Sequence, residues 1–492
     1  MRFSEVGKSA VMVVSLTIVS AALIAYGSTY LDRAAAVAAC SCLVACLAAF
    51  VLWYRPNASL GKVRGVSSPN APRKEQPLIP LTILFILMLS GPPMFRGRDP
   101  LASVRGEIDT VVLIQMTVWV LAGLWTLRQL FLRRLGSRPL LPSHFPLRLG
   151  LLLMLLLAAS TLVSPGPALT AFKVYQMLVM LLFPSMLVEE YGVRACLRLL
   201  LVGYAVLSLA IVVSIFVAPG LVIAGEAARV RGDALVDTGS ISVFTLIMLF
   251  TSAVELSTIP YLVLAGIDLV LLAVSRTRTA YVAFFAFLML AILVRPAISR
   301  LRWVLGATLA AIAAIAMTGL GPATAWLVRE PESISTLSDR VGLWSYLLDV
   351  LLKKSPWIGL GYYSASRVYG LEYNSNLGTA HSGWIEILVG GGFLSLAVFV
   401  LLMGAIIACA VRLLPRIKTD RFSFASCALL VAVLAFSSMG WGEFDFGPVA
   451  LTFWCLVAIL PSLASDSGRD FFARFAELPP SREQRPTERG GL

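Results

Sequence analysis

Apolar stretches recur along the whole chain, and each is bounded by charged residues, Pro or Gly. A helix needs about 20 mainly apolar residues to cross the hydrocarbon core of a bilayer. The pattern predicts fourteen spans, over residues 9–27, 34–53, 78–91, 110–127, 149–164, 169–188, 199–218, 238–254, 259–274, 280–294, 303–319, 383–410, 422–439 and 447–464. We therefore expect an all-α polytopic membrane protein, with one transmembrane domain over residues 1–464 and a cytoplasmic tail over 465–492.

The basic residues indicate how these spans are oriented. With the N-terminus in the cytoplasm, 26 of the 40 Lys and Arg residues fall on the cytoplasmic side. Short cytoplasmic loops of membrane proteins are enriched in such residues. Both termini are therefore expected in the cytoplasm, and residues 321–382 become one large loop on the opposite, periplasmic side.

Composition agrees with this class and argues against several others. The chain is 58% hydrophobic and only 14% charged, and its net charge of +13 is scattered over short loops rather than gathered on one face, so no nucleic acid is expected. Three of the seven cysteines share one apolar run, as Cys40, Cys42 and Cys46, with no His or acidic residue nearby. We interpret them as small buried apolar residues, and neither a metal nor another cofactor is expected.

Several charged residues fall on the outer side, against the positive-inside trend. They are Arg229, Arg231, Arg276, Arg278, Glu443, Asp445 and, near the outer end of the sixth span, Lys173. Each has an ordinary explanation: Arg276 and Arg278 could anchor a helix end at the lipid headgroups, and Arg229 and Arg231 could pair with nearby acids. Within the ninth span, Asp268 is expected to face the bundle and to pair there.

The large loop contains an amphipathic helix that is expected to lie at the membrane surface. It begins near Ser338, and Pro356 with the following glycines ends it. Its predicted apolar face comprises Val341, Trp344, Leu348 and Leu351. Arg340 falls in the first turn, where the helix dipole disfavours a cation, so either a partner anion or exposure to solvent is expected.

Of the two histidines, His381 directly precedes the twelfth span, and His144 lies in a basic cytoplasmic loop. A neutral imidazole can accept a proton from an attacking hydroxyl, whereas arginine binds phosphate through two parallel hydrogen bonds. His381 could equally cap its helix or contact headgroups, and His144 is expected on the surface. Together, His381 and the outer cations are compatible with group transfer from a diphosphate held at the membrane surface.

Four segments, in this order, resemble the O-antigen ligase and polymerase superfamily, which includes lipopolysaccharide ligases and Wzy-type polymerases. The segments are RVRGDALVDTGSIS, SRTRTAYVAFFAFLMLAILV, LSDRVGLWSYLLDVLLKKSPWIGLGYYS and TAHSGWIEILVGGGFLSLAVFV, between residues 229 and 400. Arg278 matches the family's Ser-Arg-Gly motif, Arg340 and Trp344 its Arg-x-x-x-Trp helix, and His381 its His-Asn box. The chain departs from the family in having Thr279 for Gly and Ser382 for Asn.

The resemblance implies a GT-C-like, metal-independent glycosyltransferase of the bacterial inner membrane, with its site on the periplasmic side. Its partners would be a polyprenyl-diphosphate-linked glycan donor, a glycan or lipid-linked acceptor, membrane lipid, and the proteins of polysaccharide export and chain-length control. Arg231, Arg276, Arg278, Arg340 and Lys173 would hold the diphosphate, and His381 would activate the acceptor hydroxyl.

The resemblance leaves the outcome of the reaction open. Polymerisation of exopolysaccharide or O-antigen repeat units is the leading prediction, and transfer of a finished glycan to lipid A core or protein is the alternative. A lipid-linked sugar flippase is disfavoured, because its charges would line a path between both membrane faces, whereas the distinctive charges here collect on one side.

Overall fold

The computed structural model describes residues 110–135, 144–217, 223–224, 229–230, 238–251, 253, 256, 258–275, 277–294, 340–373, 380, 382–439 and 447–476. Apart from one pair of two-residue strands, the regular elements in these segments are helices. They are α4 (Thr110–Leu135), α5 (Phe145–Ala159), η2 (Ser160–Val163), α6 (Pro167–Tyr191), α7 (Val193–Val217), β1 (Ile223–Ala224), β2 (Arg229–Val230), α9 (Thr238–Phe250), α10 (Thr258–Ser275), α11 (Arg278–Val294), α15 (Arg340–Lys354), α16 (Ser364–Tyr373), α17 (Gly383–Leu413), α18 (Arg421–Met439) and α19 (Gly447–Ala476).

Ten of the fourteen predicted spans coincide with described helices, which confirms that the chain is helical and is consistent with a polytopic membrane protein. Five described helices are long and apolar enough to cross a membrane, and three further apolar helices are shorter. The predicted spans 9–27, 34–53, 78–91 and 303–319 lie outside the described residues. The total of fourteen and the side on which the large loop lies therefore stay predictions.

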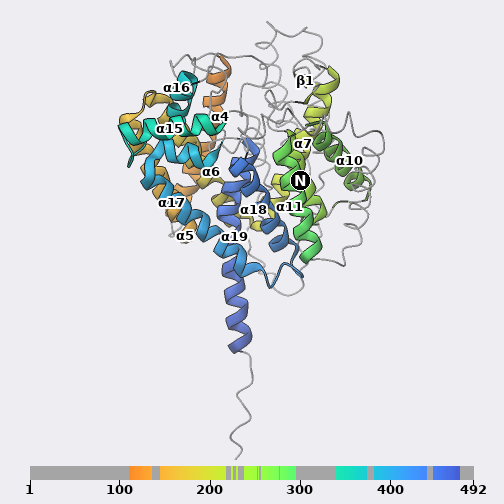
Figure 1. Cartoon of the computed structure of the whole chain (residues 1–492). Helices are drawn as coiled ribbons and strands as arrows, with labels where there is room; N and C mark the ends of the chain where they lie inside the picture. Colours follow the sequence, from red (N-terminus) through yellow and green to blue (C-terminus); the bar gives the residue numbers. More distant parts are fainter. Residues whose placement is uncertain are drawn as a thin grey trace, which may run out of the picture.

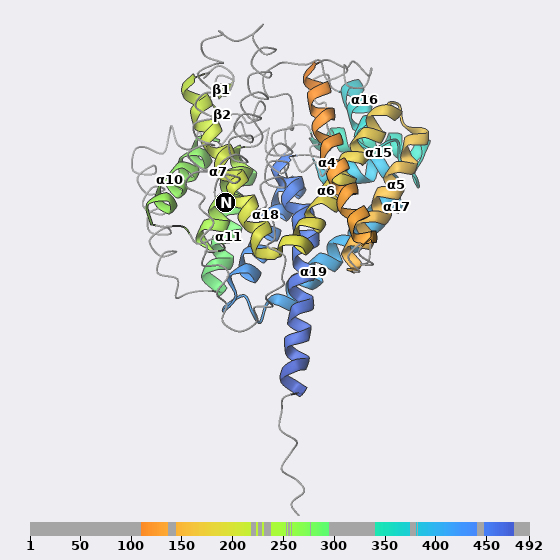
Figure 2. The same ribbon diagram turned by 180° about the vertical axis from the view of Figure 1, so that it is seen from behind.

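The described helices form two groups with α18 and α19 between them (Figure 1). On one side, α17 packs along α5 and α6 packs against α4 and α5. On the other, α9 packs against α7 and α10, and α11 packs against α18. The view from behind shows the same division, with the β1–β2 pair near the end of α7 (Figure 2). Because α19 also packs on α6 and α17, it joins the two groups.

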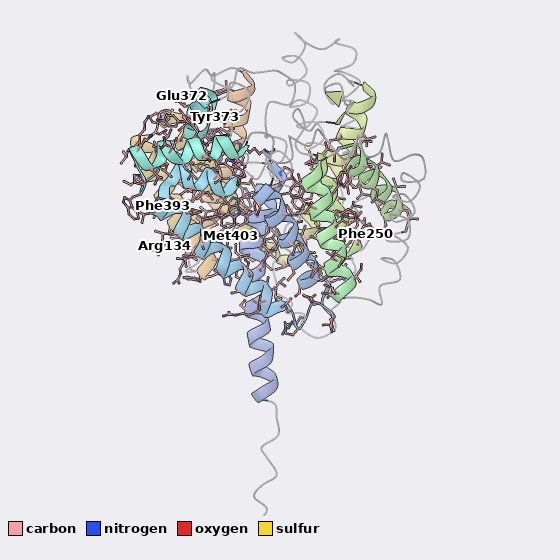
Figure 3. The ribbon with its side chains drawn as sticks, in the orientation of Figure 1. Arg134, Phe250, Glu372, Tyr373, Phe393 and Met403 are labelled. Carbon is pink, nitrogen blue, oxygen red and sulfur yellow. The ribbon has the colours of Figure 1, made fainter. Side chains whose placement is uncertain are left out.

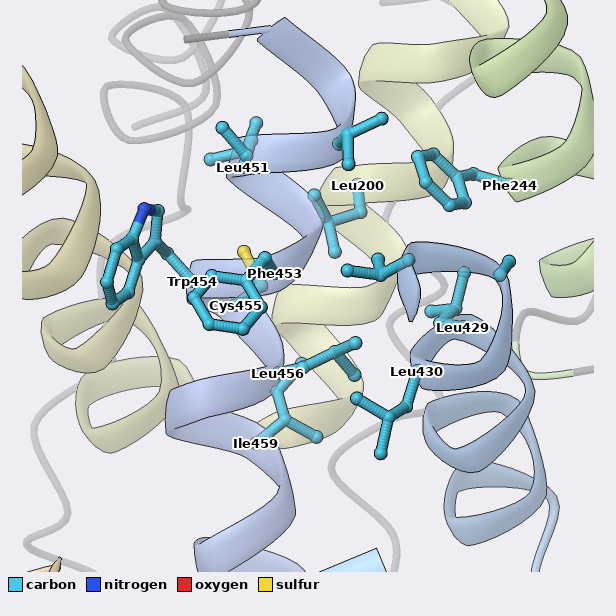
Figure 4. Close-up of a cluster of buried hydrophobic side chains, with 14 of the residues drawn as sticks. Leu200, Phe244, Leu429, Leu430, Leu451, Phe453, Trp454, Cys455, Leu456 and Ile459 are labelled. Atoms are coloured by element: carbon cyan, nitrogen blue, oxygen red, sulfur yellow. The ribbon is translucent and has the colours of Figure 1, made fainter. Parts of the chain in front are cut away.

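The core around α19 is built from large apolar side chains. Figure 4 shows Phe453, Trp454 and Leu456 of α19 among leucines of α7 and α18 and Phe244 of α9. Phe453 and Trp454 are fully buried and their rings meet edge to face, with centroids 4.7 Å apart. Such pairs add to the stabilisation that burial alone supplies. The helix continues to Ala476, past the predicted end of the last span at residue 464 (Figure 1).

Other large apolar side chains remain exposed on the outward faces of the helices. Leu155 of α5, Leu262 of α10 and Leu293 of α11 are 68%, 61% and 74% exposed. A soluble protein rarely leaves so many apolar groups in contact with water, whereas lipid tails are apolar themselves. These faces therefore suit a hydrocarbon environment.

The buried face of α15 differs from the predicted one. Leu343, Leu347 and Leu351 are fully buried, whereas Val341 is 46% exposed. The predicted burial of Leu351 is confirmed, but that of Val341 was wrong, because leucines at spacing four, Leu343, Leu347 and Leu351, form the buried row. This row packs on Leu360, Ala365, Ala380, Leu388 and Val389, so the helix is held by protein on that side.

The chain after α15 docks into a break in α17. Gly392 has φ 70° and ψ −173°, which interrupts the helix. The carbonyls of Val389 and Gly390 instead accept hydrogen bonds from the N–H groups of Leu360 (2.9 Å) and Gly361 (3.0 Å). In an unbroken helix these two carbonyls would instead accept hydrogen bonds from the N–H groups of residues 393 and 394.

The displaced N–H groups on the far side of the break are also satisfied by the docked loop. Phe393 N–H donates to the Pro356 carbonyl at 2.9 Å, and Leu394 N–H donates to the Trp357 carbonyl at 3.3 Å. The rings of Trp357 and Phe393 meet edge to face beside this contact, and Figure 3 labels Phe393 at the edge of the molecule. Four hydrogen bonds between this loop and α17 thus replace the backbone hydrogen bonds that the break removes from the helix.

Glycine is required where the two backbones meet. A Cβ on Gly359 (φ +88°) would lie 2.3 Å from the Gly390 carbonyl oxygen, and one on Gly392 would lie 2.4 Å from the Trp357 carbonyl oxygen. The positive φ would also strain any other residue. The Gly-x-Gly after Pro356 and the triple glycine of α17 are therefore two halves of one contact.

Candidate functional site

Of the nine residues singled out from the sequence, Lys173 and Arg340 are described with their side chains. Arg278 and Arg229 are described by their place in the backbone, as the first residue of α11 and of β2. Arg231, Arg276, His381, Glu443 and Asp445 lie outside the described residues. That these nine residues lie close together therefore stays a prediction for most pairs of them.

The two residues that flank His381 are described and held in place. The indole Nε1 of Trp344 in α15 donates to the Ala380 carbonyl at 2.7 Å. Ser382 is the N-cap of α17, with an extended backbone, and its carbonyl accepts the Glu386 N–H at 2.9 Å. The Arg-x-x-x-Trp helix is thus fixed to the residue directly before His381.

Arg340 and Trp344 stand one helical turn apart, so they share a face of α15. Burial lowers the pKa of the Arg340 guanidinium below its ordinary value. Arginine nevertheless stays protonated in proteins, so Arg340 is a half-buried cation on the face of α15 that Trp344 fastens to Ala380.

Arg278, like Arg340, is the first residue of its helix. The Thr277 carbonyl accepts the N–H groups of Ala280 (3.0 Å) and Tyr281 (3.2 Å), so α11 begins at Arg278. Arg340 likewise begins α15. The first N–H groups of a helix have no partner within it and attract anions, and a cation there is disfavoured unless an anion is bound. Both positions therefore suit a negatively charged ligand.

Lys173 lies in a cluster that joins α6 to α16. Its side chain is almost completely buried, and Nζ lies 4.1 Å from the centre of the Tyr363 ring. The guanidinium carbon of Arg367 lies 4.7 Å from the same centre, and its Nη2 donates to the Tyr363 hydroxyl. Two cations from distant parts of the chain thus converge on one aromatic ring.

The sequence did not single out Arg367 or Glu386. Glu386 is 1% exposed in the first turn of α17, and its Oε1 accepts a hydrogen bond from Ser366 Oγ at 2.8 Å. A carboxylate is favoured at a helix N-terminus, and this bond fixes α16 beside the start of α17. Arg367 carried a signal that could have found it, since it is another cation on the predicted outer side.

Three hydroxyls hold α16 against the start of α6. Ser164 Oγ lies 2.6 Å from Ser364 Oγ and 2.8 Å from Thr170 Oγ1, and the last two atoms are 2.8 Å apart. Thr170 also donates to the Tyr362 carbonyl at 3.1 Å. Because buried hydroxyls are costly unless they are bonded, this network fixes the backbone just before Tyr363.

A metal site finds no support in the described part of the chain. No group of three or more His, Cys, Asp or Glu side chains there is placed to hold a metal ion. The predicted independence of metal stays a prediction, because five of the candidate residues are not described.

Comparison with known proteins supports the expected family. Residues 261–400 match the profile of the family described as O-antigen ligase (Wzy_C), which confirms the resemblance to the O-antigen ligase and Wzy-type superfamily. The matched region contains Arg278, Arg340 and His381, whereas Lys173 precedes it. No curated protein matches the chain.

Proposed function

Because residues 261–400 carry the O-antigen ligase family's region, we propose that this multi-pass membrane protein is a polymerase of lipid-linked oligosaccharide repeat units. A hydroxyl of the acceptor sugar attacks the anomeric carbon of the donor glycan, and the bond from that carbon to the diphosphate oxygen breaks. Polyprenyl diphosphate leaves, and the hydroxyl proton passes to a base. The products are a lengthened glycan and the free lipid diphosphate.

Each proposed role follows from the chemistry of the side chain. Arg278 and Arg340 bind the diphosphate and stabilise the charge that develops on the leaving oxygen. His381 accepts the proton of the attacking hydroxyl. Arg231, Arg276 and Lys173 complete the cationic surroundings, and Arg229, Glu443 and Asp445 are further candidates for contacts with the glycan or the diphosphate.

The structural observation that supports the proposed site is the contact between Trp344 and Ala380. It fastens the helix that begins with Arg340 to the residue directly before His381, at 2.7 Å between Nε1 and the carbonyl oxygen. A phosphate-binding cation and a proton acceptor must lie near the same scissile bond, and this hydrogen bond brings their segments together.

The proposed location of the reaction is the periplasmic face of the bacterial inner membrane, with both termini in the cytoplasm. A polyprenyl carrier keeps its diphosphate at the membrane surface, so the site must open there. The reaction needs no metal in this proposal, because the arginines supply the positive charge that a metal would otherwise provide.

The second candidate is a ligase that transfers the finished glycan to lipid A core or protein, and the matched family is described as O-antigen ligase. Both enzymes use the same donor chemistry. Loss of a polymerase leaves single repeat units on the lipid carrier, whereas loss of a ligase leaves long lipid-linked chains. Analysis of the carrier-bound glycans after gene deletion decides between them.

The test of the catalytic roles uses purified protein in liposomes with a lipid-linked glycan donor. We expect His381→Ala and Arg278→Ala to lower transfer at least about 100-fold, in line with the loss of a general base or of a transition-state charge contact. His144→Ala is the matched control, since His144 is the N-cap residue of α5 and precedes the matched region, and it should retain transfer. Wild-type turnover by either folded variant refutes the role assigned to that residue.

A further inference from the structure

We propose that Lys173, Tyr363 and Arg367 form a diphosphate-binding subsite, in which Arg367 is a donor-binding residue of the same site. This inference rests on the proposed function and adds Arg367 and Tyr363 to it. The ligand is the diphosphate of the lipid-linked donor, bound through its non-bridging oxygens.

The geometry of the two cations is the first argument. Nζ of Lys173 and the guanidinium carbon of Arg367 lie 4.1 Å and 4.7 Å from one ring centre, so they are at most about 9 Å apart. Like charges at this separation repel each other in a partly buried region, where water screens them poorly. The negative face of an aromatic ring offsets part of that repulsion, and a bound anion with several oxygens would offset more.

The conformation of Tyr363 is the second argument. It has φ +65°, which a non-glycine residue rarely adopts and which costs free energy. The Ser366 hydroxyl shares its one proton between the Tyr363 carbonyl, at 3.1 Å, and Glu386, and the Arg367 guanidinium donates to the Tyr363 hydroxyl. The surroundings thus hold a strained backbone so that one ring meets both cations, which is typical of residues that serve a ligand.

The third argument is that the subsite is rigid and lies beside the predicted catalytic segment. The hydroxyls of Ser164, Thr170 and Ser364 fix α16 to α6, and Ser366 fixes it to Glu386. Glu386 belongs to the first turn of α17, which begins directly after the His381 segment. The cations therefore keep a fixed place relative to the start of α17.

The kinds of side chain indicate a diphosphate rather than a sugar. Arginine can bind two phosphate oxygens at once through its planar fork, and lysine adds a compact point charge. A sugar would stack on an open aromatic face, but Tyr363 is only 5% exposed and already carries two cations. A lipid headgroup phosphate has related chemistry, so the experiment must separate the two sources.

The experiment measures transfer by the full chain in liposomes, with donor and acceptor concentrations varied separately. We expect Arg367→Gln to raise KM for the lipid-linked donor about tenfold or more, with kcat and the acceptor KM changed less than about twofold, since a lost charged hydrogen bond weakens binding by that order. Arg367→Lys should recover part of the loss, and Tyr363→Phe, which lacks the hydroxyl that accepts from Arg367, should raise the donor KM less.

The chain offers a matched control. Lys354 Nζ lies 4.4 Å from the ring centre of Tyr369 and 3.0 Å from its hydroxyl, in the same kind of contact but on the exposed face of α15 and α16. Lys354→Gln should leave both KM values unchanged. A rise in the donor KM of this variant equal to that of Arg367→Gln would mean a general effect of surface charge and would refute the subsite.

Two further outcomes would overturn the inference. The first is that folded Arg367→Gln protein has the donor KM of the wild type. The second is that the donor KM of this variant returns to the wild-type value when phosphatidylglycerol is omitted from the liposomes. The second result would mean that the two cations bind lipid headgroups rather than the donor. Binding of undecaprenyl diphosphate to the detergent-purified protein is measured in parallel, independently of transfer. Weaker binding of this lipid by Arg367→Gln and Tyr363→Phe supports the subsite, whether or not the wild type transfers glycan. Failure of the wild type to transfer glycan would refute the proposed function but not the subsite.

Discussion

The polar side chains where α6, α16 and α17 meet are held in a different way from Asp268 in the junction of α7, α9 and α10. In the first region, hydroxyls, backbone groups and glycines from four separate segments exchange hydrogen bonds. In the second, Asp268 is fully buried and its Oδ1 accepts one bond, from Ser208 Oγ of α7 at 2.6 Å. The predicted inward orientation of Asp268 is thereby confirmed, and Ser208 satisfies one of its two carboxylate oxygens, whereas Oδ2 has no hydrogen-bond partner among the described residues.

The difference shows what each region positions. The first region holds a loop and a short helix against the membrane helices, and the residues it places include Lys173 and Arg367. The second region ties one helix to another inside an apolar bundle. A buried carboxylate in a membrane helix is usually a sign of function. We infer a structural role for Asp268 instead, because the hydrogen bond from Ser208 ties α10 to α7.

The largest effect is expected where the first region depends on glycine. Gly359→Ala introduces a Cβ 2.3 Å from a backbone carbonyl at a positive φ, so it should destabilise the fold by about 2–3 kcal/mol or more and displace the loop. We expect a lower thermal unfolding midpoint in detergent and a loss of glycan transfer.

Gly404→Ala in α17 is the matched control, because a Cβ there meets nothing within 4 Å. This change should be neutral or should stabilise the helix by about 0.5–1 kcal/mol. If Gly359→Ala unfolds at the same temperature as Gly404→Ala and remains active, the docked loop does not have the structural importance that we assign to it.

A smaller effect is expected from the second region. Asp268→Ala leaves the Ser208 hydroxyl without its acceptor and should cost about 1–3 kcal/mol of stability, whereas Asp268→Asn keeps an acceptor oxygen and should cost less. Transfer per folded molecule should stay near the wild-type value in both variants. A folded but inactive Asp268→Asn protein would contradict the structural role and would place this carboxylate in the reaction.

The sequence predicted the features that depend on local pattern. Spans such as α6 and α17 follow from the length of their apolar runs, and the end of α15 at Lys354 follows from Pro356 and the glycines after it. The burial of Asp268 followed from the cost of a charge in lipid.

What the sequence could not predict depends on contacts between distant segments. Two rows of apolar residues on α15 could each form its buried face. The row through Leu347 is the buried one because it packs on Leu388 and Val389. The fit of Gly359 against Gly390 joins residues that no periodicity connects. Arg367 and Lys173 meet on the Tyr363 ring although they lie far apart in the sequence, so no local pattern connects them.

The most direct test of the central claim is the fate of the lipid carrier during transfer. Purified protein in liposomes is supplied with a lipid-linked repeat unit, and released polyprenyl diphosphate is counted against new glycosidic bonds. We predict one diphosphate released for each bond formed in the wild type, with both products lowered together at least about 100-fold in His381→Ala and Arg278→Ala. Glycan that crosses the membrane still attached to its carrier, with no bond formed and no diphosphate released, would contradict the claim and would favour a flippase.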